Sequence, residues 1–221
     1  MKHNVGISET SQQYMNAFVN TPPSPSFFRY ILPLTKGKKV LDVGSGAGQF
    51  LAHFSTESVG LDISLPNIIR CQEKGFNVRT SDFNVRLECI DQEFETVFCS
   101  HVLEHVDAPI NFLRECNRCL IDGGMLIIGV PTAKSIVRLF RDRYFHDHPE
   151  HLYAFSVENL TWLLIRTGFT VERVFIDLRK VKQWHLTWFL DMCQKLPPWT
   201  TLWFSNGYWM VANKSFKRII N

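Results

Sequence analysis

Residues 40–50, with the sequence VLDVGSGAGQF, decide the fold of this chain. The first four, Val40–Val43, form a pattern typical of a short buried strand, and the pattern breaks at a glycine. Gly44, Gly46 and Gly48 then alternate with other residues. Because glycine has no side chain, such a turn can bend sharply and let the backbone approach a ligand. We therefore predict a strand, a ligand-facing turn, and a helix from about Gly48 whose first amide groups point at the ligand.

The spacing of these glycines separates two kinds of ligand. A dinucleotide fold carries G-x-G-x-x-G, whose third glycine would stand at position 49. This chain has Gln49 there, and its spacing is G-x-G-x-G. That spacing favours an adenosylated amino acid, which needs room for its sulfonium and its carboxylate. A dehydrogenase is the disfavoured alternative, and a tight turn that binds no ligand is another.

Strand-like and helical patterns alternate along the rest of the chain. Apolar, β-prone segments recur at 59–62, 77–80, 94–100, 124–130, 170–176 and 208–212. Helical patterns start near Ser64, at Asp107–Pro109 and at Ser156, which we expect to cap its helix. The alternation predicts a Rossmann-like, doubly wound α/β fold: a mostly parallel, seven-stranded sheet with an antiparallel last strand and a C-terminal aromatic cap. Ligands of such sheets bind at the carboxyl ends of the strands.

Acidic residues follow two of the predicted strands. A carboxylate at Asp62 can accept hydrogen bonds from both hydroxyls of a ribose, although a charge favouring the next helix is the alternative reading. Asp82 follows the next strand and is placed to accept from an adenine amino group. Phe83 could form an apolar wall for the ring. The sequence therefore predicts an adenosine site.

Several motifs together resemble those of class I S-adenosylmethionine methyltransferases, in particular ubiquinone O-methyltransferases and methyltransferases of sugars and natural products. The motifs lie at residues 40–48, 60–64, 100–106, 120–124 and 148–156, and the resemblance covers about residues 38–176. It implies transfer of a methyl group from S-adenosylmethionine to a small molecule, sugar or lipid-linked acceptor, at oxygen. The cofactor-binding residues that we expect are Asp42, Gly44, Ser45, Gly46, Gly48, Asp62, Ile63, Ser81, Asp82, Phe83, Ser100 and His101.

Histidines are the candidate catalytic residues. Methyl transfer from a sulfonium is a direct displacement, and a hydroxyl acceptor is helped by a general base near neutral pKa. His101 follows a predicted strand at the cofactor site, and His148 and His151 lie in a loop that we expect to fold over it. The alternative for His151 is a role in bracing the loop. Glu104 and His105 could simply order the start of the next helix.

The resemblance also raises the question of a metal. Ubiquinone O-methyltransferases carry Glu-x-x-Glu-His in the matching segment, which is thought to hold a divalent cation. This chain has His101 in place of the first Glu, followed by Glu104 and His105. We expect no metal here.

Composition narrows the class of protein. The net charge of +3, from 24 Lys+Arg against 21 Asp+Glu, does not indicate a nucleic-acid partner. The six cysteines include one C-x-x-C, Cys116 and Cys119, and we expect all six to be free thiols in a reducing cytoplasm. No secretory signal and no apolar run of about 18 residues is visible, so we expect a soluble cytoplasmic protein.

We divide the chain into three parts: an N-terminal substrate-side segment (1–34), a cofactor-binding core (35–176), and an aromatic and basic cap with the closing strand (177–221). Residues 178–204 mix basic residues with tryptophans, which is typical of a packed cap or of weak contact with a membrane surface. The sequence leaves two other functions open, methylation of RNA or protein and a catalytically silent cofactor-binding scaffold.

Overall fold

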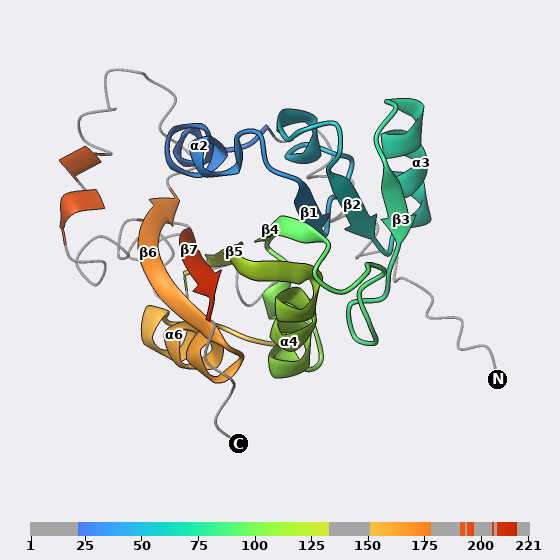
Figure 1. Cartoon of the computed structure of the whole chain (residues 1–221). Coiled ribbons are helices and arrows are strands. Elements are labelled where there is room, and N and C mark those ends of the chain that lie inside the picture. The colour runs from blue at the N-terminus through green and yellow to red at the C-terminus, as the bar shows by residue number, and fades with distance from the viewer. Residues whose placement is uncertain are drawn as a thin grey trace.

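A seven-stranded sheet forms the centre of the protein (Figure 1). The computed structural model describes residues 22–132, 151–177, 191–192, 194–196, 205 and 207–215. In spatial order the strands are β3 (Val78–Thr80), β2 (Val59–Asp62), β1 (Val40–Val43), β4 (Phe94–Ser100), β5 (Leu120–Pro131), β7 (Gly207–Lys214) and β6 (Phe169–Asp177). The predicted strands are therefore all present, and three of them have the predicted ends.

The sheet is mostly parallel, as predicted. β1 pairs in parallel with β2 and β4, β2 with β3, and β4 with β5, whereas β7 runs antiparallel to both β5 and β6. Val43 stands opposite Leu61 on one side and Cys99 on the other. The carboxyl ends of β1, β2 and β4 therefore meet at one edge of the sheet, where ligands of such folds bind.

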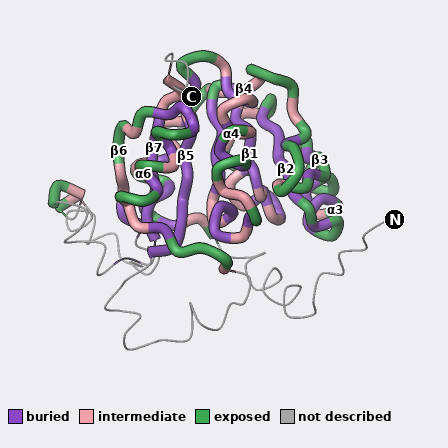
Figure 2. Tube along the Cα trace, turned by 90° about the horizontal axis from the view of Figure 1, so that it is seen from below, coloured by how far each residue is buried: buried purple, intermediate pink, exposed green. Residues whose placement is uncertain are grey.

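Helices cover both faces of the sheet. Alternate strand residues point to opposite faces, so a strand with apolar residues throughout presents apolar side chains on both. In β4, Phe98 packs with Phe27 and Ile31, while its neighbours Val97 and Cys99 belong to the other, larger apolar cluster. Figure 1 shows α4 and α6 on one face and α2 and α3 on the other, and Figure 2 colours most of the central strands as buried. The helices are η1 (Phe27–Ile31), α2 (Leu32–Thr35), α3 (Leu65–Glu73), α4 (Pro109–Cys119) and α6 (Val157–Arg166), with short 3-10 helices η2 (Leu51–His53) and η3 (Leu103–His105).

Two helix predictions have different outcomes. Ser156 caps α6, because its hydroxyl accepts a hydrogen bond from Asn159 N–H. The predicted helix from Gly48 is wrong: a series of turns leads only to η2. Gly48 has a φ of +85°, which a right-handed helix excludes, and the chain must return to the sheet at Val59.

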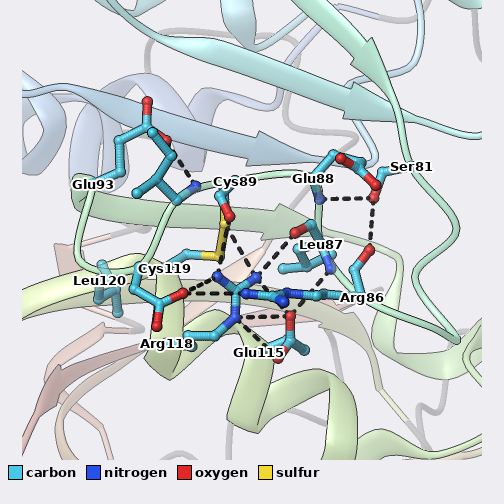
Figure 3. The surroundings of a disulfide bond; sticks show 12 residues. Ser81, Arg86, Leu87, Glu88, Cys89, Glu93, Glu115, Arg118, Cys119 and Leu120 are labelled. Carbon is cyan, nitrogen blue, oxygen red and sulfur yellow. Dashed lines mark hydrogen bonds and ion pairs between the residues drawn. A yellow bond between two sulfur atoms is a disulfide. The ribbon is translucent and has the colours of Figure 1, made fainter.

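The prediction of free thiols is wrong for two cysteines. Cys89 and Cys119 form a disulfide, with their Cα atoms 6.3 Å apart (Figure 3). Cys119 is the last residue of α4, and the segment before β4 folds back against that end of the helix. Cys71, Cys99 and Cys116 are free and buried, as predicted.

Among the described residues, no helix is both long enough and apolar enough to cross a membrane.

Candidate functional site

The glycine turn lies at the carboxyl end of β1 and is tied to β2. The N–H groups of Gly44 and Ser45 both donate to Leu61 O, at 2.8 and 2.9 Å. Gly44 has a φ of +75°, and a methyl group added to it would overlap Val102. A Cβ on Gly48 would lie 2.8 Å from the Phe76 ring. These glycines are therefore required by the packing of the turn as well as by its backbone.

Asp62 joins this turn at the end of β2. Its Oδ2 accepts from Gly46 N–H and its Oδ1 from Ser64 N–H, both at 2.8 Å. Ser64 is the N-cap residue of α3, but its side chain makes no capping hydrogen bond. Burial raises the pKa of Asp62 above its ordinary value, although these backbone hydrogen bonds oppose the shift. Asp62 thus serves the helix start and the glycine turn at once.

A second carboxylate is buried next to the turn. Asp42 lies within β1 and is 1% exposed. Burial raises its pKa to about 8, and the charge of Asp62 adds to the shift. Neither Asp42 carboxylate oxygen has a hydrogen-bond partner within the described part of the chain. A cation that enters beside the two carboxylates favours their ionised forms and is attracted by them.

The segment after β3 approaches the same turn. Ser81 N–H donates to Asp62 O at 3.0 Å, and Phe83 Cε2 lies 3.9 Å from the position of a Cβ on Gly44. Asp82 is exposed, and its Oδ1 accepts from Asn84 N–H at 2.9 Å. The structure therefore brings the glycine turn, Asp62 and Phe83 together. Ile63, another predicted cofactor contact, is 50% exposed.

His101 follows β4 at the same edge of the sheet. Ser100 is the last residue of the strand, and His101 takes a φ of +56°, with its N–H donating to Gly129 O at 2.9 Å. Its Nδ1 lies 3.2 Å from Glu104 Oε1. The structure thus pairs the candidate base with a carboxylate that was not among the predicted site residues.

Glu104 also lies beside two further imidazoles. Glu104, His105 and His151 each offer an atom within 4.8 Å of the others, and the two imidazole rings are 4.8 Å apart between centroids. The 151–155 segment is fastened here, because Leu152 N–H donates to Glu104 O at 2.9 Å and Tyr153 Oη–H to Asp107 O at 2.9 Å. His151 is therefore close to the site, as predicted, whereas His148 lies outside the described residues.

This cluster differs from the set that the sequence suggested for a metal. The sequence suggested His101, Glu104 and His105, whereas the structure groups His151 with Glu104 and His105. His101 is outside this group and contacts Glu104. One carboxylate with two imidazoles is a donor set that transition metals accept. The sequence predicted that the loop with His151 folds over the site, but no local spacing predicts that His151 joins Glu104 and His105.

The aromatic residues of the N-terminal segment have several roles. Phe27 is buried in the core, and Phe28 is 42% exposed. Tyr30 stacks on Phe175, and its hydroxyl donates to Asp191, which Arg29 also contacts. The segment therefore connects to the part of the chain that follows β6.

Comparison with known proteins gives a family match. A model of the methyltransferase domain matches residues 16–174. The ubiquinone biosynthesis O-methyltransferase of Psychrobacter arcticus is 24% identical over 161 residues, 62% of this chain and 61% of that protein. The tRNA U34 carboxymethyltransferase of Pseudoalteromonas translucida is 36% identical over 129 residues, 52% of this chain and 39% of that protein. The chain thus spans less than two thirds of the length of these relatives.

Solved structures share the fold. An S-adenosylmethionine-dependent methyltransferase from Archaeoglobus fulgidus superposes with a TM-score of 0.64 at 27% identity, covering 85% of this chain and 91% of that one. A chain in the complex between the Haloferax volcanii Trm112 methyltransferase activator and a putative methyltransferase gives a TM-score of 0.70 at 14% identity, covering 93% and 94%.

Proposed function

The chain belongs to the methyltransferase-domain family, and on this basis we propose that it transfers a methyl group from S-adenosylmethionine to an oxygen of a small molecule, sugar or lipid-linked acceptor. The observation that carries the proposal is the hydrogen bond from Gly46 N–H to Asp62, next to the buried carboxylate of Asp42. S-adenosylmethionine carries an ammonium and a sulfonium, which suit a site with two carboxylates. Its ribose can replace the backbone partners of Asp62 without leaving the carboxylate unpaired.

The cofactor site in this proposal is the set predicted from the sequence. The glycine turn and Asp42 face the amino acid end, Asp62 binds the ribose, and Ser81 to Phe83 border the adenine. Ser100 and His101 stand beside the sulfonium. Support comes from the meeting of these segments at one edge of the sheet.

The reaction that we propose is a single displacement. The acceptor oxygen forms a bond to the methyl carbon, and the carbon–sulfur bond breaks with its electron pair passing to sulfur, which becomes a neutral thioether. The hydroxyl proton passes to the base, for which His101 is our candidate, because it lies next to the end of β4 and is partly exposed. His151 and His148 remain the alternative bases.

RNA is the second candidate acceptor. The similarity to a protein named as a tRNA U34 carboxymethyltransferase favours it. Affinity for RNA that falls steeply with salt would support this alternative over a small acceptor.

Calorimetry with S-adenosylmethionine tests the cofactor site. Asp62→Ala should weaken binding by at least about tenfold, since charge-assisted hydrogen bonds to the ribose are lost. Glu57→Ala is the matched control, because Glu57 is exposed and precedes β2, at the opposite end of that strand from Asp62. Wild-type protein that takes up no S-adenosylmethionine contradicts the cofactor, and an unchanged affinity in Asp62→Ala contradicts the role of Asp62.

A further inference from the structure

The partner of His101 is a carboxylate that the fold has buried. Glu104 lies in η3, and its side chain is 0% exposed, whereas that of His101 is 23% exposed. His101 Nδ1 faces Glu104 Oε1 at 3.2 Å. Because Nδ1 and Nε2 lie on different sides of the ring, Nε2 is directed away from this carboxylate.

The charge of Glu104 decides which ring nitrogen carries the proton. His101 Nδ1 lies 3.2 Å from Glu104 Oε1, within hydrogen-bond distance. A carboxylate in its ionised form can only accept hydrogen bonds. The proton between the two residues must then belong to His101 Nδ1, which leaves the lone pair of a neutral imidazole on Nε2.

The backbone holds both residues in this arrangement. His101 keeps a left-handed φ of +56° while its N–H donates to Gly129 O in the neighbouring strand. Glu104 O accepts from Leu152 N–H at 2.9 Å and from Tyr153 N–H at 3.3 Å. A left-handed residue other than glycine and a buried charge are both unfavourable, and such features persist where the surrounding structure imposes them.

We propose that Glu104 is the positioning residue for His101: it accepts the Nδ1–H bond, fixes that tautomer, and so keeps Nε2 free to take the proton of the acceptor hydroxyl. The inference rests on the proposed function, because it concerns the same proton transfer. It adds a residue that neither the sequence motifs nor the cofactor geometry had assigned to the reaction.

Nuclear magnetic resonance of protein labelled with ¹⁵N-histidine tests this without any acceptor. Wild-type His101 should show the Nδ1–H tautomer. Glu104→Met keeps a similar length but removes the hydrogen-bond acceptor, so the ratio of Nδ1–H to Nε2–H should fall by at least about tenfold, the value of a hydrogen bond to a charged group. Glu104→Gln should retain the Nδ1–H tautomer, because its amide oxygen still accepts.

The matched control is Glu93→Met. Glu93 also has a partly buried, ion-paired carboxylate, bound to Lys39, but it precedes β4 and so lies at the opposite end of that strand. This variant should leave the His101 signals unchanged. The inference is wrong if wild-type His101 is the Nε2–H tautomer, or if Glu104→Met keeps the Nδ1–H tautomer. Failure of the proposed function appears separately, as absence of S-adenosylmethionine binding by calorimetry.

Discussion

At the scale of the residue, Asp42 makes the stability of the protein depend on pH. Its pKa is about 8 in the folded protein, against an ordinary value of 3.8. Between these values the native state binds a proton that the unfolded chain does not. The free energy of unfolding should therefore fall as pH rises through this window, by up to about 1.4 kcal/mol per pH unit.

Asp42→Asn should flatten this fall, because an amide needs no proton to be neutral. Urea denaturation from pH 5 to pH 9 measures the effect as a gap between variant and wild type that widens with pH. Asp122→Asn is the control, since the Asp122 side chain is 64% exposed and the residue lies near the start of β5. Parallel curves for wild type and Asp42→Asn would contradict the assignment.

At the scale of the element, the glycine turn combines two separate demands. Gly44 and Gly37 have nearly the same φ, +75° and +73°. A Cβ on Gly44 overlaps Val102, whereas one on Gly37 meets nothing within 4 Å among the described residues. Gly37→Ala should therefore lower the free energy of unfolding by only about 1 kcal/mol, the cost of a left-handed backbone at alanine. Gly44→Ala should lower it by roughly 1–3 kcal/mol more, because its Cβ also overlaps Val102.

A double-mutant cycle separates these terms. Adding Val102→Ala to Gly44→Ala should recover the part due to overlap but not the backbone part. Chemical denaturation measures each free energy of unfolding. Equal losses of unfolding free energy in Gly37→Ala and Gly44→Ala would show that Val102 moves aside freely. Packing against Val102 would then not require a glycine at position 44.

The same elements show what the sequence could predict. β1 and β2 are continuous buried runs, and β4 is buried except at Glu95 and at its end; each of the three ends at a glycine or at a polar residue, which is why the predicted ends are correct. The helix after Gly48 could not be excluded, because apolar spacing does not report the sign of φ. The sequence could place Gly44, Asp62 and Ser100 at strand ends, and their role in binding the cofactor stays a prediction. The approach of His151 to Glu104 joins residues 47 positions apart in the chain, and local spacing could not predict it.

At the scale of the whole molecule, the Cys89–Cys119 disulfide acts on the unfolded chain. In the folded protein the 87–91 segment has other ties to α4: Arg118 donates to Leu87 O and Cys89 O, both at 3.0 Å, and to Asp91, while Leu87 N–H donates to Glu115 (Figure 3). These bonds can hold the segment in place without the disulfide. The crosslink, which closes a sequence separation of 30 residues, therefore removes freedom mainly from the unfolded state.

Reduction should accordingly lower the free energy of unfolding by about 3–4 kcal/mol, the chain-entropy value for a loop of this length. Guanidinium denaturation with and without dithiothreitol measures the difference, and alkylation of the denatured protein with mass spectrometry should count two more thiols after reduction. A Cys89→Ser, Cys119→Ala double variant is the control, since its stability should not respond to the reductant. Equal thiol counts before and after reduction would show that the bridge does not form, and an unchanged denaturation midpoint despite reduction would contradict the predicted stabilisation.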